Sequence, residues 1–226
     1  MGQPAAVTML SDVLLAPVEG LRRLWLALAN QMIDRRIARC DQPVFSAGYW
    51  KDHCENWDRH LAPWKGRPDL RFLEIGCFEG GSTLWFLDNV LTAPGSSIVC
   101  IDTFVRQGGE PRFRHNVRVS GHSARVRVIK GRSDVAMSRL HEQRFDVIYI
   151  DGSHRAADVM LDAVQAWPML RRGGLLIFDD YAWQPELPPQ DRPRLAIDAF
   201  LRAFSAEYEL RHKEYQVIVR KTASPE

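Results

Sequence analysis

Lysine is scarce in this chain of 226 residues, because only five of its 30 basic residues are lysines and the rest are arginines. An excess of one charge is also lacking, since 28 acidic residues reduce the formal net charge to +2. A protein that binds nucleic acid through its overall charge needs a clear positive excess. The composition therefore gives no support to a general nucleic-acid binder, and most arginines are expected on solvated faces beside acids.

Cysteine is rare as well, and the four cysteines form neither a CxxC pair nor a cluster with histidine. This spacing argues against a disulfide framework and against a typical zinc site. No apolar run approaches the roughly 18 residues that a membrane-spanning helix requires. The N-terminus also lacks the positively charged segment and cleavage site of a signal peptide. We therefore expect a cytoplasmic protein without a transmembrane segment.

Apolar residues recur at three- and four-residue steps through the first 45 residues, with a break near Pro17 and Gly20. This spacing predicts amphipathic helices. A stripe of this kind usually packs against the main domain or against a second copy of the chain, so a homo-oligomer formed through these helices is one expectation. Association with a membrane surface through Trp25 and nearby arginines is the alternative.

From residue 70 onward, short apolar runs alternate with helical patterns. Strands are expected at 71–76, 97–102, 126–130, 145–151 and 174–179, and an antiparallel hairpin at 208–211 and 215–220. Helices are expected at 82–91, 133–142, 156–170 and near 195–204. Continuous apolar runs are typical of strands buried on both faces of a parallel sheet. The pattern predicts an α/β fold with a doubly wound, seven-stranded, mostly parallel Rossmann-like sheet over 70–226, behind a helical extension and an aromatic segment at 1–69.

A glycine-bearing loop at 76–82 follows the first expected strand and leads into a helix. Glycine lets the backbone approach a ligand, and a helix N-terminus offers free N–H groups to an anion. Phe78 stands where a dinucleotide-binding loop has its middle glycine, which disfavours a dehydrogenase. Asp102 ends the second strand, where doubly wound nucleotide sites place the acid that binds a ribose. The turn 131–134 ends the third strand and is suited to border an adenine.

Asp151, Asp179 and Asp180 follow two further strands that one helix connects. Their carboxylates are expected at one rim of the sheet, where they would repel one another unless a cation lay among them. Hard oxygen ligands without cysteine indicate Mg²⁺, with Ca²⁺ or Mn²⁺ as alternatives. The plainer interpretation is that these acids cap loops and helices. His154 would face the same rim as a proton acceptor, whereas the other six histidines are interpreted as surface or packing residues.

These motifs together resemble the class I S-adenosylmethionine-dependent methyltransferases. The loop Glu74-x-Gly76-x-x-x-Gly80-x-Ser82 is similar to that of metal-dependent O-methyltransferases of the catechol and caffeoyl-CoA type. The runs 149–154 and 179–181 resemble the macrocin O-methyltransferase-like group, which methylates sugar hydroxyls on antibiotics. The resemblance covers about residues 70–221 and is not specific to one substrate.

The resemblance implies S-adenosylmethionine and a divalent cation, Mg²⁺ or another, as cofactors. The cofactor-binding positions it implies are Glu74, Gly76, Gly80 and Ser82 at the methionine end, Asp102 at the ribose, Thr103 or Phe104 against the adenine, Gly131, Ser133 and Asp134 on the adenine side, and Asp151. It further implies Asp151, Asp179 and Asp180 as metal ligands, and His154 with Asp151 as the catalytic residues.

The function expected is therefore Mg²⁺-assisted methyl transfer to a hydroxyl of a small molecule, such as a sugar, a glycan or a secondary metabolite. RNA or protein is the alternative acceptor, because residues 106–132 form a basic stretch, although three clustered acids would discourage a polyanion. A cofactor-binding partner without catalysis is the remaining alternative. Walls of the acceptor pocket are expected from Tyr49, Trp50, Trp57, Trp64, Tyr181 and Trp183, and the proline-rich loop 183–193 is either a lid or a stiff connection.

Overall fold

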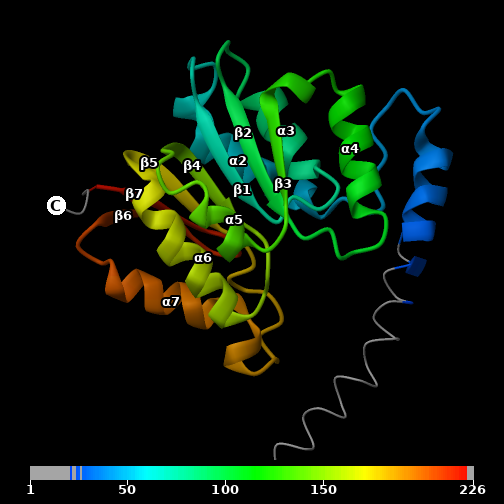
Figure 1. Ribbon diagram of the computed structural model, residues 1–226. Helices are drawn as coiled ribbons and strands as arrows, with labels where there is room; N and C mark the ends of the chain where they lie inside the picture. The colour runs from blue at the N-terminus through cyan, green and yellow to red at the C-terminus, as the bar shows by residue number, and fades with distance from the viewer. Residues whose placement is uncertain (1–20, 22–23, 26, 223–226) are drawn as a thin grey trace, which may run out of the picture.

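A computed structural model describes residues 21, 24–25 and 27–222 of the chain. A single sheet runs through the molecule (Figure 1). Its order is β3-β2-β1-β4-β5-β7-β6. The strands are β1 (Arg71–Ile75), β2 (Ser97–Asp102), β3 (Val126–Lys130), β4 (Phe145–Ile150), β5 (Leu170–Phe178), β6 (Tyr208–Lys213) and β7 (Val217–Lys221). The first five pair in parallel and β7 runs antiparallel to both its neighbours. The predicted seven-stranded, mostly parallel sheet is confirmed.

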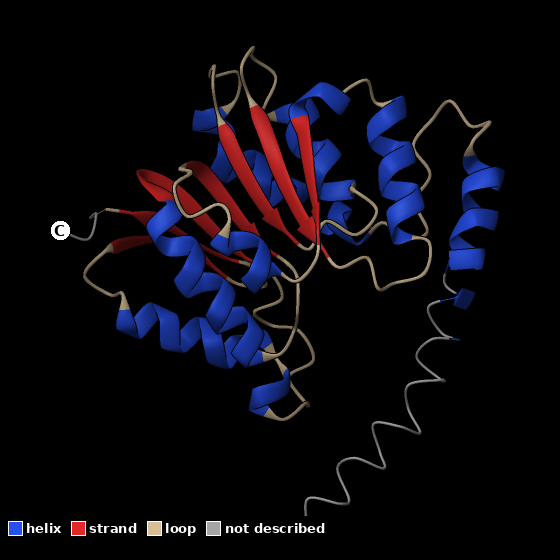
Figure 2. Ribbon diagram, in the orientation of Figure 1, coloured by secondary structure: helices blue, strands red, loops and turns tan. Residues whose placement is uncertain are grey.

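Helices cover both faces of this sheet (Figure 2). They are α2 (Cys54–Leu61), α3 (Gly81–Asn89), α4 (Gly109–Val119), α5 (Ser133–Ser138), α6 (Ala156–Met169) and α7 (Pro193–Ala203). One core cluster joins the sheet to α5, α6 and α7, and a second joins it to α2, α3 and α4. The central strands contribute side chains to both clusters, which explains their continuous apolar sequences.

Backbone hydrogen bonds continue past the strand ends and bring four loops to one edge of the sheet. The N–H of Gly76 donates to Ile101 O at 2.8 Å, and the N–H of Asp151 donates to Ile75 O at 2.8 Å. The N–H of Asp179 donates to a carbonyl at the end of β4 at 3.0 Å. The residues that follow β1, β2, β4 and β5 therefore share the carboxyl edge, where open α/β sheets bind ligands.

Two helices lie where the sequence pattern predicted none. Helix α4 lies within the basic stretch and buries Phe113 and Val117, while its arginines Arg114 and Arg118 are exposed. Its spacing is helical, but the apolar positions are too few among the arginines to dominate the pattern. Helix α2 buries Trp57 and Leu61. Helix α5 ends at Ser138, earlier than expected, and β5 begins directly after α6.

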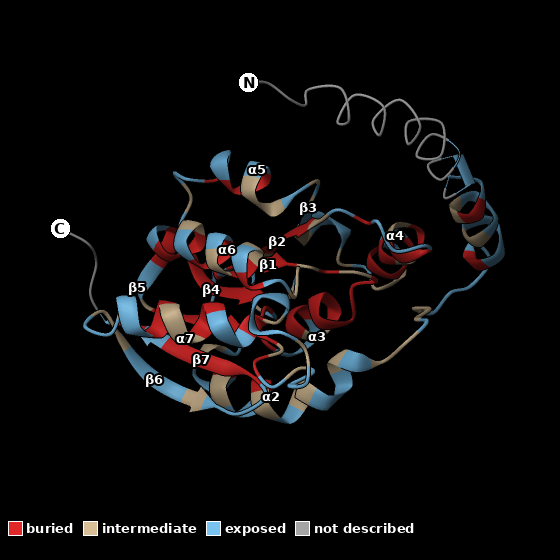
Figure 3. Ribbon diagram, turned by 90° about the horizontal axis from the view of Figure 1, so that it is seen from below, coloured by how far each residue is buried: buried red, intermediate tan, exposed pale blue. Residues whose placement is uncertain are grey.

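A helix that ends at residue 37 lies alongside α4 (Figure 3). Ala29 and Ile37 are buried, and the side-chain oxygen of Asn30 accepts a hydrogen bond from the N–H of Gly108 at 2.9 Å. Other apolar side chains of this helix are exposed, among them Trp25 and Met32. The described residues form the predicted helix, but only Ala29 and Ile37 of them are buried, and the packing of this helix against a second copy of the chain stays a prediction. The part of the prediction that concerns residues 1–20 lies outside the described residues.

None of the helices in the described ranges has both the length and the apolar character that crossing a bilayer demands.

Candidate active site

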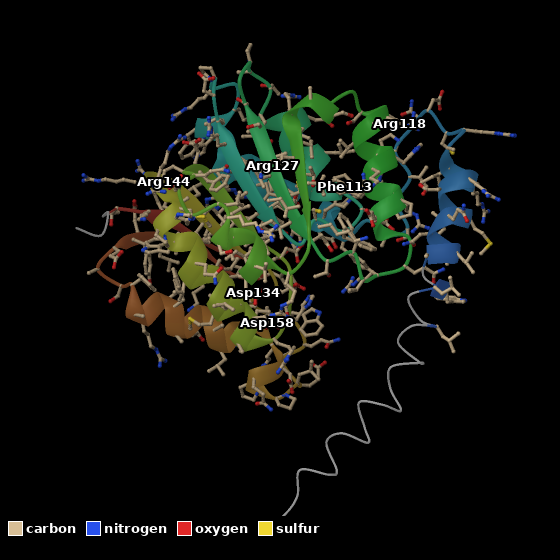
Figure 4. The ribbon with its side chains drawn as sticks, in the orientation of Figure 1. Phe113, Arg118, Arg127, Asp134, Arg144 and Asp158 are labelled. Atoms are coloured by element: carbon tan, nitrogen blue, oxygen red, sulfur yellow. The ribbon has the colours of Figure 1, made fainter. Side chains whose placement is uncertain are left out.

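A cavity of about 1080 Å³ opens at the carboxyl edge of the sheet. Its walls come from the loops after β1 to β5, from the start of α6 and from the segment that precedes α2. Figure 4 shows Asp134 of α5 and Asp158 of α6, which line one end of this cavity. Most of the predicted cofactor residues and the predicted acid cluster thus line the same cavity.

The glycine loop forms the floor at one end of the cavity. Gly76 has φ +89°, and a Cβ atom there would lie 1.9 Å from the carbonyl oxygen of Asp151. Only glycine therefore permits the close approach of the β1 and β4 ends. Gly76 and Ser82 line the cavity, as expected for cofactor-binding residues, whereas Gly80 lies outside its lining and begins α3 with φ +82°.

Glu74 lies beneath this loop and not in the cavity, with 0% of its surface exposed. Its two carboxylate oxygens accept hydrogen bonds from the hydroxyls of Ser82 and Thr83, and the thiol of Cys100 donates at 3.5 Å. Burial raises the pKa of Glu74 to about 7, against the lowering effect of these donors. Glu74 therefore does not line the cavity, and its hydrogen bonds hold the first turn of α3.

Asp102 lines the cavity and also holds two loops in place. Its carboxylate accepts the N–H of Phe78 at 2.8 Å and the N–H of Phe104 at 2.6 Å. Thr103 lines the cavity as predicted. Phe104 does not, because its ring is buried against Phe113 with centroids 5.6 Å apart. Of the two residues proposed against an adenine, the structure places only Thr103 at the cavity wall.

The predicted adenine side is present, and it includes an acid that the sequence analysis missed. Gly131, Ser133 and Asp134 line the cavity, and Arg132 forms a 3.0 Å ion pair with Asp134. Asp162 of α6 lines it too while remaining 2% exposed, and burial raises the pKa of Asp162 to about 6. Asp162 lies at a position of α6 where the helical spacing predicts a core residue. An acid at such a position was the signal in the sequence that could have identified it.

The three predicted metal ligands lie together at the other end of the cavity, after β4 and β5. The hydroxyl of Tyr149 donates to Asp179 and lies 3.2 Å from a carboxylate oxygen of Asp151. The side-chain amide of Gln216 donates to Asp179 at 3.2 Å. Asp180 adopts a left-handed backbone with φ +59°, which aspartate tolerates better than most residues. The expectation that these acids converge on one rim is met.

Negative charge is concentrated at this end of the cavity. Burial raises the pKa of Asp151 well above its ordinary range, and the charges of Asp179 and Asp180 raise it further. Burial also raises the pKa of Asp179. Burial acts in the same direction on Asp180, but its hydrogen bond to His154 and the charge of that ring hold the pKa of Asp180 below its ordinary value.

His154 stands at the rim as predicted. Its Nε2 lies 2.7 Å from a carboxylate oxygen of Asp180, and its ring packs on Trp183 with centroids 4.3 Å apart. A carboxylate that holds one nitrogen of a histidine ring orients the ring, and the other ring nitrogen remains able to exchange a proton.

A second histidine lies at the same acid cluster and corrects the interpretation of the other six as surface or packing residues. His53 Nε2 lies 3.6 Å from Asp179, and its ring stacks on Tyr215 with centroids 5.5 Å apart. The hydroxyl of Tyr215 in turn donates to Asp180 at 2.7 Å. Both residues come from segments far from the motif in sequence, so spacing alone gave no signal for them.

The aromatic residues expected in the acceptor pocket divide into two groups. Tyr49, Trp50 and Trp183 line the cavity, in agreement with the prediction. Trp57 is instead fully buried between the sheet and α3, and Trp64 and Tyr181 lie outside the lining. Proximity to the first strand in the sequence did not distinguish core from cavity.

The residues present fit a divalent cation in their chemistry. Three carboxylates without a neighbouring thiol are hard oxygen donors, and their mutual repulsion is what a cation would relieve. No group of three or more acid, histidine or cysteine side chains among the described residues is already gathered in a ligating arrangement. Instead, hydrogen bonds to Tyr149, Gln216 and Tyr215 hold the carboxylates.

Part of the basic stretch 106–132 is paired with acids of the chain. Arg112 pairs with buried Glu79 at 2.9 Å, and Arg114 and Lys130 both pair with Glu110. Arg106 lies over the ring of Phe78 and lines the cavity at its cofactor end. Arg132 pairs with Asp134, so four of the eight lysine and arginine residues of this stretch pair with acids of the chain.

Comparison with known proteins agrees with this geometry. Residues 73–181 match the model of a family described as a methyltransferase domain. Protein R132 of Acanthamoeba polyphaga mimivirus is 30% identical over 131 residues, which cover 54% of this chain and 58% of the viral protein. This chain spans about half the length of the curated relatives it matches.

Solved structures share the fold at low sequence identity. The methyltransferase MycE of the mycinamycin biosynthetic pathway, in complex with Mg, SAH and mycinamycin VI, superposes with a TM-score of 0.59 and 20% identity, covering 84% of this chain and 53% of MycE. The O-methyltransferase TomG of Streptomyces achromogenes, involved in tomaymycin synthesis and in complex with SAM, gives 0.59 and 17%, covering 88% and 89%.

The sheet order, the glycine loop and the acid at the end of β2 define a class I methyltransferase fold. This chain shares the fold of these solved methyltransferases, and its residues 73–181 match the model of the methyltransferase domain family.

Proposed function

We propose that this protein is an S-adenosylmethionine-dependent O-methyltransferase that uses a divalent cation, Mg²⁺ in the first place, to methylate a hydroxyl of a small molecule. The observation that carries the proposal is the position of His154 and of three carboxylates in the same cavity as the glycine loop. MycE, whose fold this chain shares, is in complex with Mg and SAH, and TomG is in complex with SAM. A sugar, a glycan or a secondary metabolite is the acceptor class proposed.

The cofactor would lie along the glycine loop, with Gly76 and Ser82 at its methionine end. Asp102 would accept hydrogen bonds from the ribose hydroxyls, and Thr103 would border the adenine. Gly131, Ser133 and Asp134 would complete the adenine side. When bound there, the cofactor supplies an electrophilic methyl group on its sulfonium. The residues that do not line the cavity, Glu74, Gly80 and Phe104, would act by shaping these loops.

Asp151, Asp179 and Asp180 would hold the cation, which when bound supplies Lewis-acid activation of the acceptor hydroxyl. His154 would accept the hydroxyl proton, because Asp180 orients its ring at the rim of the cavity. Trp183, Tyr49 and Trp50 would exclude water and orient the acceptor. The three clustered carboxylates in the cavity favour such a small acceptor over a polyanion.

Turnover with labelled cofactor and an extract of candidate acceptors tests this proposal. We expect EDTA to abolish methyl transfer, Mg²⁺ to restore it, and SAH affinity to change little. His154→Ala should lower kcat by roughly 10²- to 10⁴-fold with SAH affinity unchanged, because it removes only general-base help. Full turnover in EDTA would contradict the metal assignment, and full kcat in the histidine variant would contradict the base assignment.

A further inference from the structure

Tyr149 is held rigidly beneath the acid cluster. It is the fifth residue of β4, it is 2% exposed, and its ring lies outside the cavity lining. The ring meets Trp57 of α2 edge-on with centroids 5.5 Å apart and Phe86 of α3 with centroids 5.7 Å apart. These contacts fix the ring, so the position of its hydroxyl is set by the core and not by the cavity.

The hydroxyl lies between carboxylates from two neighbouring strands. It donates a short hydrogen bond to Oδ2 of Asp179, which follows β5, and lies 3.2 Å from Oδ2 of Asp151, which follows β4. A phenol has one proton, so it can donate to only one of these carboxylates at a time. The hydroxyl therefore holds the two carboxylates close together without neutralising either charge. A cation beside the two carboxylates would stabilise this arrangement.

We propose that Tyr149 is a positioning residue that sets the separation and orientation of Asp151 and Asp179 for a divalent cation. The inference rests on the proposed function, because it assigns a role to the cation site named there. It adds a residue that touches neither the cavity nor the acceptor. Groups that orient metal ligands in this way commonly change metal affinity by 10- to 100-fold when they are removed.

The test measures Mn²⁺ affinity of the full chain by calorimetry in the presence of SAH, so that its readout does not depend on activity. Tyr149→Phe keeps the packed ring and removes only the hydroxyl. We expect Mn²⁺ to bind about 10- to 100-fold more weakly to this variant, while SAH affinity stays within about twofold. Unchanged Mn²⁺ affinity in Tyr149→Phe would overturn the proposal.

Two further variants separate positioning from general effects. Tyr208→Phe removes a hydroxyl that donates to Leu201 O at 3.0 Å, far from the cluster, and should leave Mn²⁺ affinity unchanged. Gln216→Leu removes the other neutral side-chain donor to Asp179 and touches only one of the two acids. We expect the Mn²⁺ affinity of this variant to stay within about threefold of that of wild type. A loss of Mn²⁺ affinity of about tenfold or more would assign the positioning role to Gln216 instead of Tyr149. This outcome can be read even if Tyr149→Phe fails to fold.

Wild-type chain that binds no Mn²⁺ would contradict the proposed metal dependence as well as this inference. Wild-type chain that binds Mn²⁺ as tightly as Tyr149→Phe would contradict the inference alone.

Discussion

Glu74 has no access to the cavity, yet its charge bears directly on the loop that forms the cavity floor. Its carboxylate receives the hydroxyls of Ser82 and Thr83 from the first turn of α3. Burial raises its pKa from 4.5 to about 7, so the folded protein disfavours ionised Glu74 more than the unfolded chain does. The ionisation of one residue under the cofactor loop is therefore coupled to folding.

This coupling gives the stability a definite pH dependence. A pKa that is raised on folding contributes stability that is fully present below about pH 4.5 and is lost as the pH rises through about 7. The difference amounts to about 3 kcal/mol. The side chain that Glu74→Gln introduces cannot ionise. The free energy of unfolding of this variant should therefore rise relative to that of wild type as the pH increases from about 4.5 to above 7.

Urea unfolding at about pH 4.5, 6 and 7.5 measures the effect through the shift in midpoint. The exposed Glu142→Gln serves as a control and should show a constant difference from wild type at all three values. Parallel pH profiles for Glu74→Gln and wild type would show that Glu74 ionises normally in the folded protein.

At the scale of elements, the close approach of the β1 and β4 ends depends on Gly76. Its Cβ position lies 1.9 Å from Asp151 O, and its φ is +89°. Gly121 offers a matched comparison, because its φ is +78° and nothing lies within 4 Å of its Cβ position. Gly121→Ala should cost about 1 kcal/mol from backbone conformation alone, whereas Gly76→Ala should cost more than about 4 kcal/mol because two strand ends must separate.

Chemical denaturation compares these two glycine variants, and SAH affinity reports on the loop. We expect Gly76→Ala to lose SAH binding and Gly121→Ala to retain it. Similar unfolding midpoints for the two variants would mean that the loop after β1 relaxes easily, and the close approach would then have no energetic role.

The helices and strands differ in how well they can be predicted from sequence. The strands that build the site were predictable because each is a short apolar run that ends at a polar residue, and parallel strands bring those ends to one edge. Helix α4 was missed because its buried positions include the polar residues His115 and Asn116, so its sequence shows no clear apolar stripe. His53 was missed because nothing near it in the sequence belongs to the motif, and only the packing of α2 brings it to Asp179. Contacts between distant segments are set by tertiary packing, which local periodicity does not record.

At the scale of the whole molecule, the segment that precedes residues 73–181 is joined to the glycine loop after β1. Ser46 donates through its N–H and its hydroxyl to buried Glu79, both at 2.6 Å. Trp50 lies over the start of α3, since a Cβ atom at Gly81 would meet its ring at 2.0 Å. The site therefore depends on residues 42–50 as well as on the domain that the family model covers.

Asn116 of α4 is the residue that links these parts, because it is fully buried and contacts both. Its side chain accepts the N–H of Val44 at 2.6 Å and donates to Val44 O at 3.1 Å and to Glu79 O at 2.9 Å. Asn116→Leu keeps the volume but removes three hydrogen bonds to the backbone, one of them to buried Glu79 O and two to half-buried Val44, each worth about 1 kcal/mol. We expect the free energy of unfolding to fall by at least about 3 kcal/mol. SAH should bind about tenfold more weakly if roughly 1.4 kcal/mol of that loss reaches the loop.

Asn89→Leu, which removes a single exposed bond to Trp85 O, should change neither quantity. Loss of stability with unchanged SAH affinity would show that residues 42–50 support the fold without shaping the cofactor loop.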